Sequence, residues 1–267
     1  MRRSVLLATT LGLLLAAPVV VRGDDRPDHD FANDVDGALW AIDVQKLEWR
    51  KLGHIEVPAA GPLPGGQQVA SPLDRPVLID LASTPDGYLW AISETALYLV
   101  NITDPTKSVR VGEHHLDAPY GLGLGLGGQL LATTRDGQVV SIDPRTAKAT
   151  PLGSLGGGLR ASGDVAYIPP AREGEPERLV ATVKDASRTE LLAEVDPKTG
   201  AGRVIGKLRL ADGTPVPDVF GLIVRKGVLH GLTRDGGVFV IDPATAVCRR
   251  TAKADVLWWG ATEYLRM

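Results

Sequence analysis

Short apolar runs bounded by polar turns recur along the chain after residue 23. A clear example is residues 137–153, GQVVSIDPRTAKATPLG, where a β-branched run ends at Ile142. A β-branched run too short for a helix is typical of a buried strand. Asp143 and Pro144 follow, and these residue types favour a type I turn because Asp accepts backbone hydrogen bonds and Pro fixes φ. The segment predicts a strand, a turn and a second strand.

Five copies of this segment can be aligned. They are residues 37–53, 96–112, 137–153, 190–206 and 236–250. The apolar residue before each turn lies at Ile42, Val100, Ile142, Val195 and Ile241, at intervals of 58, 42, 53 and 46 residues. A repeat of this length, with several strands in each copy, predicts a propeller blade.

Two further strands precede most copies, so each blade should have four antiparallel strands. The first copy has no innermost strand ahead of it, and the C-terminal segment 258–262 repeats the aromatic-Gly-apolar pattern of the other innermost strands. We therefore expect an all-β fold, a β-propeller of five four-stranded blades, with the ring closed by this C-terminal strand. A sixth blade would have to come from residues 54–77, whose Pro/Gly-rich composition instead predicts a loop.

Composition and the N-terminal segment indicate which partners and which cellular location to expect. The 267 residues carry a formal net charge of −3 with a sequence pI of about 6.0. This charge lacks the basic character typical of nucleic-acid-binding proteins. Residues 1–23 have a basic start and a long apolar stretch, which predicts a cleaved signal peptide followed by a single domain, 24–267, that is secreted or periplasmic and free of the membrane. An uncleaved membrane anchor is the alternative. Cys248 is the only cysteine, so the chain can form no internal disulfide.

The pattern G-x-L-x-x-I-D-P-x-T-G, together with the Asp-Gly turns before it, resembles secreted bacterial repeat propellers, including YVTN, gluconolactonase-like and PQQ-dehydrogenase-like propellers. The resemblance covers about residues 31–264 and implies the fold. It implies no particular activity, because the shared residues form strands and turns.

Candidate site residues lie at the innermost strands, whose first residues should surround the channel. Asp80 and Asp164 fall inside these strands, where a buried carboxylate needs hydrogen bonds or a cation. Asp164 stands out because it follows Gly163 where the aligned copies have Leu81, Leu122, Leu222 or Ala261. With Asp218 these two carboxylates are the candidate metal ligands, and Ca²⁺ is the cation that oxygen ligands favour. The alternative is that Asp164 bonds backbone amides of a neighbouring blade.

Aromatic residues supply the other candidates. Tyr120, Phe220 and Trp259 should line the channel mouth and stack on a sugar ring, or else fill gaps between blades. With Asp80 and Asp164 they form the expected ligand-binding set.

No nucleophile elbow, zinc-binding pair or phosphate loop is present in the sequence. We therefore expect a monomeric, non-enzymatic module that binds a small molecule, a glycan or a protein through its loop face, with no obligatory cofactor. The alternative is a Ca²⁺-dependent hydrolase or lactonase of the gluconolactonase type.

Overall fold

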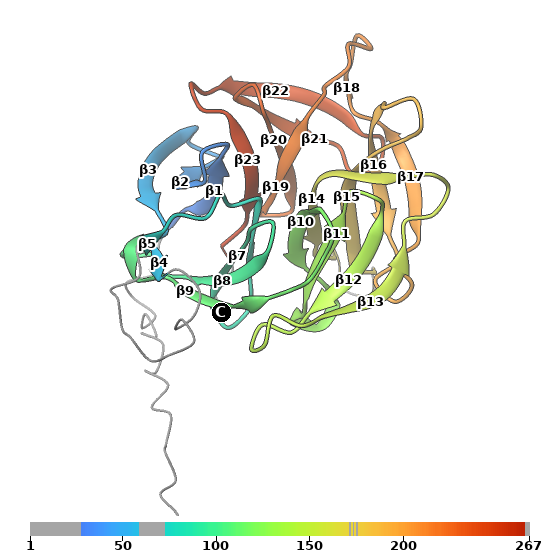
Figure 1. Cartoon of the computed structure of the whole chain (residues 1–267). Coiled ribbons are helices and arrows are strands. Elements are labelled where there is room, and N and C mark those ends of the chain that lie inside the picture. The colour runs from blue at the N-terminus through green and yellow to red at the C-terminus, as the bar shows by residue number, and fades with distance from the viewer. Residues whose placement is uncertain (1–27, 59–72, 171, 173, 175, 265–267) are drawn as a thin grey trace, which may run out of the picture.

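The computed structural model describes residues 28–58, 73–170, 172, 174 and 176–264, and these form a ring of five antiparallel sheets (Figure 1). The signal peptide predicted for residues 1–23 lies outside the described residues. Within the described part of the chain, no helix is both long and apolar enough to cross a membrane.

Each blade is a four-stranded meander that runs from an inner to an outer strand. Blade 1 consists of β23 (Trp258–Thr262), β1 (Asp30–Asp34), β2 (Ala38–Asp43) and β3 (Glu48–His54). Blade 2 consists of β6 (Asp80–Ser83), β7 (Leu89–Ile92), β8 (Ala96–Val100) and β9 (Val109–Glu113). Blade 3 consists of β10 (Pro119–Leu124), β11 (Leu130–Thr134), β12 (Gln138–Ile142) and β13 (Ala149–Ser154).

The last two blades follow the same plan. Blade 4 consists of β14 (Arg160–Ile168), β15 (Arg178–Lys184), β16 (Glu190–Val195) and β17 (Gly202–Lys207). Blade 5 consists of β19 (Val219–Arg225), β20 (Val228–Thr233), β21 (Gly237–Ile241) and β22 (Val247–Lys253). The short β18 (Arg209–Leu210) adds a parallel fifth strand outside β22. Two 3₁₀ turns, η1 (Pro105–Lys107) and η2 (Leu126–Gly128), lie in loops.

The ring closes as the sequence predicted. The C-terminal β23 pairs antiparallel with β1, in a register that places Thr262 opposite Phe31 and Ala261 opposite Ala32. Trp258 on β23 is fully buried, and its ring packs edge-on against Trp40 at 5.8 Å. Closure therefore joins the two ends of the described chain through both backbone pairing and a buried aromatic contact, and it supplies blade 1 with its inner strand.

The turns between the third and fourth strands confirm the Asp-Pro prediction and extend it by one residue. In blade 3, Thr146 N and Ala147 N both donate to Asp143 O, at 3.3 and 2.8 Å. Ala147 has φ 61°, and left-handed residues occupy the matching position in three other blades, at Leu47, Gly200 and Ala246. Each turn therefore ends in a left-handed residue, although only one of the four is glycine.

The segment between blades 1 and 2 differs in part from the predicted loop. Its two ends pair as a short antiparallel ladder, β4 (Val57–Pro58) with β5 (Leu73–Asp74). The ladder forms no blade, so the count of five stands for the described residues.

Candidate functional site

Three innermost strands carry an aromatic residue at a break in their pairing register. The register shifts between Pro119 and Gly121 in blade 3 and between Val219 and Gly221 in blade 5, which leaves Tyr120 and Phe220 as extra residues. Trp259 is the extra residue in blade 1, between the paired Trp258 and Gly260. A β-bulge re-aims the side chain of its extra residue. The three bulges turn these rings toward the start of the channel.

The rings line a cavity of about 310 Å³ that we call the mouth cavity. Its lining residues are Val35, Val77, Ile79, Glu94, Ala118, Pro119, Tyr120, Arg135, Gly163, Phe220 and Trp259. The Phe220 centroid lies 6.3 Å from that of Tyr120 and 4.9 Å from that of Trp259, so the rings form a continuous arc. The three predicted aromatics thus line one cavity, and their role in binding stays a prediction.

Two arginines extend the arc at its ends. The Arg135 guanidinium lies 5.7 Å from the Tyr120 centroid, and that of Arg234 lies 5.4 Å from the Trp259 centroid. Both residues occupy the same place in the Thr-Arg-Asp-Gly turns of blades 3 and 5. Cation–π contacts of this kind are worth about 0.5–1 kcal/mol at exposed sites. They hold the guanidinium groups beside the rings.

Asp80 and Asp164 lie fully buried at the centre of the ring and bond backbone amides. Asp164 accepts from Val165 N and, across to blade 5, from Leu222 N, both at 2.6 Å. Asp80 accepts from Leu81 N and, across to blade 3, from Leu122 N, both at 2.8 Å. The structural alternative raised from the sequence is therefore observed. These carboxyls link the inner strands of adjacent blades.

The register corrects the alignment that singled out Asp164. Equivalent residues of the first strands pair with an alanine on the second strand of their own blade. These pairs are Val165 with Ala181, Leu81 with Ala91 and Leu122 with Ala132. Asp164 therefore matches Asp80, not the leucines, because an irregularity between Ala161 and Val165 lengthens β14. Spacing along the sequence gives no sign of this shift.

Glycines occupy the matching position in the other three blades, where an added Cβ would meet a neighbouring inner strand. These are Gly121, Gly221 and Gly260, each one residue before the backbone amide that faces the centre. A Cβ added at Gly260 would lie 2.3 Å from Asp80 Oδ1. From blade 1 to blade 5, the residue at this position of the inner strand is thus Gly, Asp, Gly, Asp and Gly.

The two buried carboxyls interact directly with each other. Burial raises the pKa of both groups well above the usual aspartate range, and the Asp80 charge raises the pKa of Asp164 further. The contact with Asp164 acts on Asp80 in the opposite sense and favours its charged form. Both carboxyls are therefore protonated more readily than a solvent-exposed aspartate.

Of the three expected metal ligands, Asp80 and Asp164 contact each other, whereas Asp218 pairs with a lysine. Asp218 has φ 54° and pairs with Lys184 Nζ at 3.2 Å, outside the residues that line the mouth cavity. Across the described residues, no group of three or more His, Cys, Asp or Glu side chains is placed to hold a metal ion.

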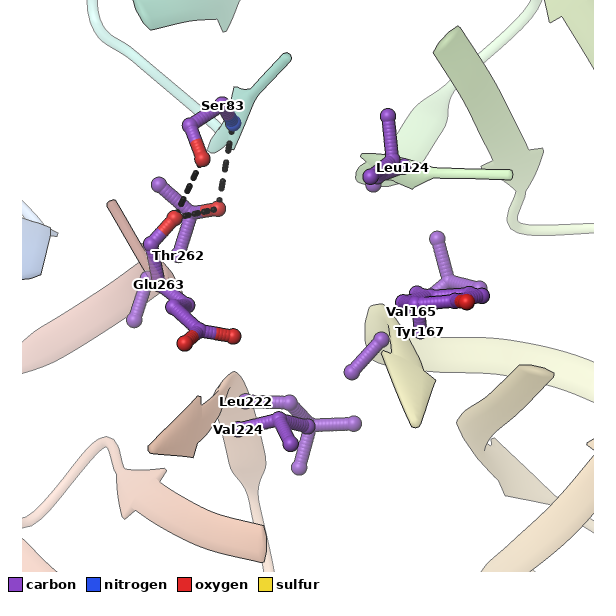
Figure 2. A pocket seen from close by; sticks show the side chains of 11 residues that line it. Ser83, Leu124, Val165, Tyr167, Leu222, Val224, Thr262 and Glu263 are labelled. Atoms are coloured by element: carbon purple, nitrogen blue, oxygen red, sulfur yellow. Dashed lines mark hydrogen bonds between the residues drawn. The ribbon is translucent and has the colours of Figure 1, made fainter. Parts of the chain in front are cut away.

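A second, smaller cavity lies at the opposite ends of the inner strands. It has a volume of about 30 Å³ and is lined by residues such as Ser83, Tyr167 and Glu263 (Figure 2). A space of this size holds about one or two water molecules. Ile79 and Gly163 line the mouth cavity, whereas Ser83 and Val165 line the small one. Asp80 and Asp164 thus lie between the two cavities, below the base of the mouth.

Sequence reasoning missed several residues of the mouth cavity. Glu94 lies in the tight turn between β7 and β8, and Val77 is 57% exposed at the rim. Glu94 could have been predicted, because it lies in the same turn of blade 2, between the second and third strands, as Arg135 does in blade 3. The position of Val77 depends on the path of the chain between blades 1 and 2, which no pattern in the sequence specifies.

Comparison with known proteins supports the fold. No family model matches the chain, and no curated protein matches its sequence. Many solved structures match its fold, among them a Bacteroides thetaiotaomicron protein of unknown function, with 13% identity and a TM-score of 0.53 over 86% of this chain. This chain spans 56% of that protein's length.

Two gluconolactonase structures are also similar in fold. A putative gluconolactonase has 14% identity and a TM-score of 0.49, and the match covers 87% of this chain and 80% of the other. A Xanthomonas campestris gluconolactonase has 11% identity and a TM-score of 0.43, covering 88% of each chain. At these identities the comparisons extend to the fold alone, and the described part of the chain is a five-bladed β-propeller.

Proposed function

We propose that the protein is a binding module that holds a small ring-bearing molecule, a free sugar or the end of a glycan, in the mouth cavity. The observation that carries this proposal is the arc of Tyr120, Phe220 and Trp259, which three separate bulges turn into one cavity. Aromatic faces offer a large, rigid contact area to a flat ring.

The lining of the cavity supports this proposal. Ligand sites are mostly apolar with a few placed polar groups, and here Glu94 and Arg135 are the only charged residues among the described lining residues. Val77 at the rim is 57% exposed, and exposed apolar side chains beside a cavity favour an interaction site. The volume of about 310 Å³ fits a single sugar ring better than an extended protein segment.

Calorimetric titration of the purified protein with a panel of neutral sugars, sugar acids and lactones tests the proposal. Tyr120→Ala should weaken binding about tenfold, since it removes one stacking face. Tyr167→Ala is the matched control, because Tyr167 also lies on an innermost strand but lines the small cavity at the other end. Unchanged affinity in Tyr120→Ala would contradict the proposal.

The same samples separate binding from catalysis. A Ca²⁺-dependent lactonase would hydrolyse a lactone in the presence of Ca²⁺ and lose that activity in Asp164→Ala. We expect no turnover, because the buried Asp164 carboxyl bonds two backbone amides and does not line the mouth cavity. If lactone turnover is measured and Asp164→Ala abolishes it, the protein is a lactonase and the binding proposal is wrong.

A further inference from the structure

We propose that the ring-bearing ligand carries a carboxylate and that Arg135 binds it. This inference rests on the proposed function and adds the charge of the ligand. It concerns the one cationic side chain among the described residues that line the mouth cavity.

The Arg135 side chain has no acidic partner in the described structure. It forms none of the salt bridges found among the described residues, although an aspartate follows it directly in the sequence. That neighbour, Asp136, instead bonds the Thr134 hydroxyl and, at 3.2 Å, Gln138 Nε2. The positive charge of Arg135 thus remains available to a ligand.

The Arg135 backbone is fixed even though its side chain is exposed. Arg135 N donates to Ala118 O at 2.9 Å, and Ala118 is held at φ 45° just before the bulge that carries Tyr120. The guanidinium then lies 5.7 Å from the Tyr120 centroid. One turn and one bulge therefore place the cation beside an aromatic face in the same cavity.

This arrangement matches a ring with a carboxylate substituent. When the ring stacks on the arc, a carboxylate at its edge meets the guanidinium, which can donate two parallel N–H bonds to it. Glu94, on another part of the cavity wall, disfavours a second negative group and can accept a bond from a hydroxyl. The ligand class is thus a monoanionic ring with hydroxyl groups, such as a sugar acid.

The repeat supplies a matched control for Arg135. Arg234 occupies the same turn of blade 5, donates its backbone N–H to Asp218 O at 3.0 Å and stacks on Trp259. It is not among the lining residues of the cavity. Arg135→Gln and Arg234→Gln thus remove the same charge from equivalent turns, one lining the cavity and the other outside it.

The test is calorimetric titration of the wild type, Arg135→Gln, Arg135→Lys and Arg234→Gln with D-glucuronate and with D-glucose, which differ at one carboxylate. The wild type should prefer glucuronate by about tenfold, in line with one charge-assisted contact in a half-open site. Arg135→Gln should abolish this preference, so that the affinity for glucuronate falls to that for glucose. Arg135→Lys should keep part of the preference, and Arg234→Gln should keep most of it.

The failures of this inference and of the proposed function can be told apart. Equal affinity of the wild type for the two sugars, or a preference that survives Arg135→Gln, would overturn the carboxylate assignment and leave the binding module in place. An equal loss of preference in Arg234→Gln would overturn the assignment to Arg135. Binding of neither sugar would overturn the proposed function and this inference with it.

Discussion

Replacing Asp164 by alanine removes two buried hydrogen-bond acceptors from the centre of the ring. Val165 N and Leu222 N, both now bonded at 2.6 Å, would lose their partners at buried positions. An unsatisfied buried group costs about 1–3 kcal/mol, so the two amides together cost about 2–6 kcal/mol. The stability of a whole domain is about 5–15 kcal/mol, so this is a large loss.

One effect acts in the opposite direction. Burial and the neighbouring Asp80 charge both disfavour the ionised form of Asp164, so its removal relieves a like-charge contact. Asp80 keeps its own bonds to Leu81 N and Leu122 N but loses the Asp164 contact that favours its charged form. We expect a net loss of about 2–5 kcal/mol in the free energy of unfolding, because the relieved repulsion is smaller than the cost of two orphaned amides.

Urea denaturation followed by tryptophan fluorescence measures this loss. Asp212→Ala is the control, since Asp212 is exposed and accepts a single bond, from Thr214 N at 2.9 Å. That variant should lose less than about 1 kcal/mol, because exposed groups regain bonds to water. An Asp164→Ala loss no larger than that of Asp212→Ala would refute the role of the pair as a link between blades.

Two further predictions concern the same channel. Gly260→Ala should lower the free energy of unfolding by about 1–3 kcal/mol, because the new Cβ would lie 2.3 Å from Asp80 Oδ1, and a shift of less than 0.5 kcal/mol in urea denaturation would contradict this. Glu263→Gln should become more stable relative to wild type as pH rises from about 4.5 to 7. Burial raises the pKa of Glu263 to about 7, so the folded wild type binds more protons than the unfolded chain in that window and loses stability as pH rises. Parallel stability curves for the two proteins over this range would show that the Glu263 carboxyl titrates normally.

The architecture could be predicted from the sequence because its signals are local and repeated. The turn at Asp143 can be recognised from its residue types. Its copies, 42 to 58 residues apart, give the number of blades. The closing strand was recognisable because Trp259-Gly260 repeats the pattern of Tyr120-Gly121, and the observed pairing of β23 with β1 confirms it.

The candidate site was only partly predictable, because bulges decide where its side chains point. Tyr120, Phe220 and Trp259 were placed at the mouth from their position at the start of a strand. Asp164 was misaligned by one position, since the irregular pairing of β14 cannot be counted from spacing. Asp218 was grouped with it by sequence position, whereas the fold pairs Asp218 with Lys184.

Ligand contact at the mouth cavity can be observed at a single side chain. The chain has five tryptophans, and only Trp259 lines the cavity among those in the described structure. In a ¹⁵N-labelled sample titrated with D-glucuronate, the indole N–H signal that is missing from Trp259→Phe should shift, while those of the buried Trp90 and Trp258 should stay in place. A saturable shift of the Trp259 signal alone is the predicted result. Binding that leaves Trp259 unmoved, or that shifts another indole instead, would contradict a ligand site at the aromatic mouth.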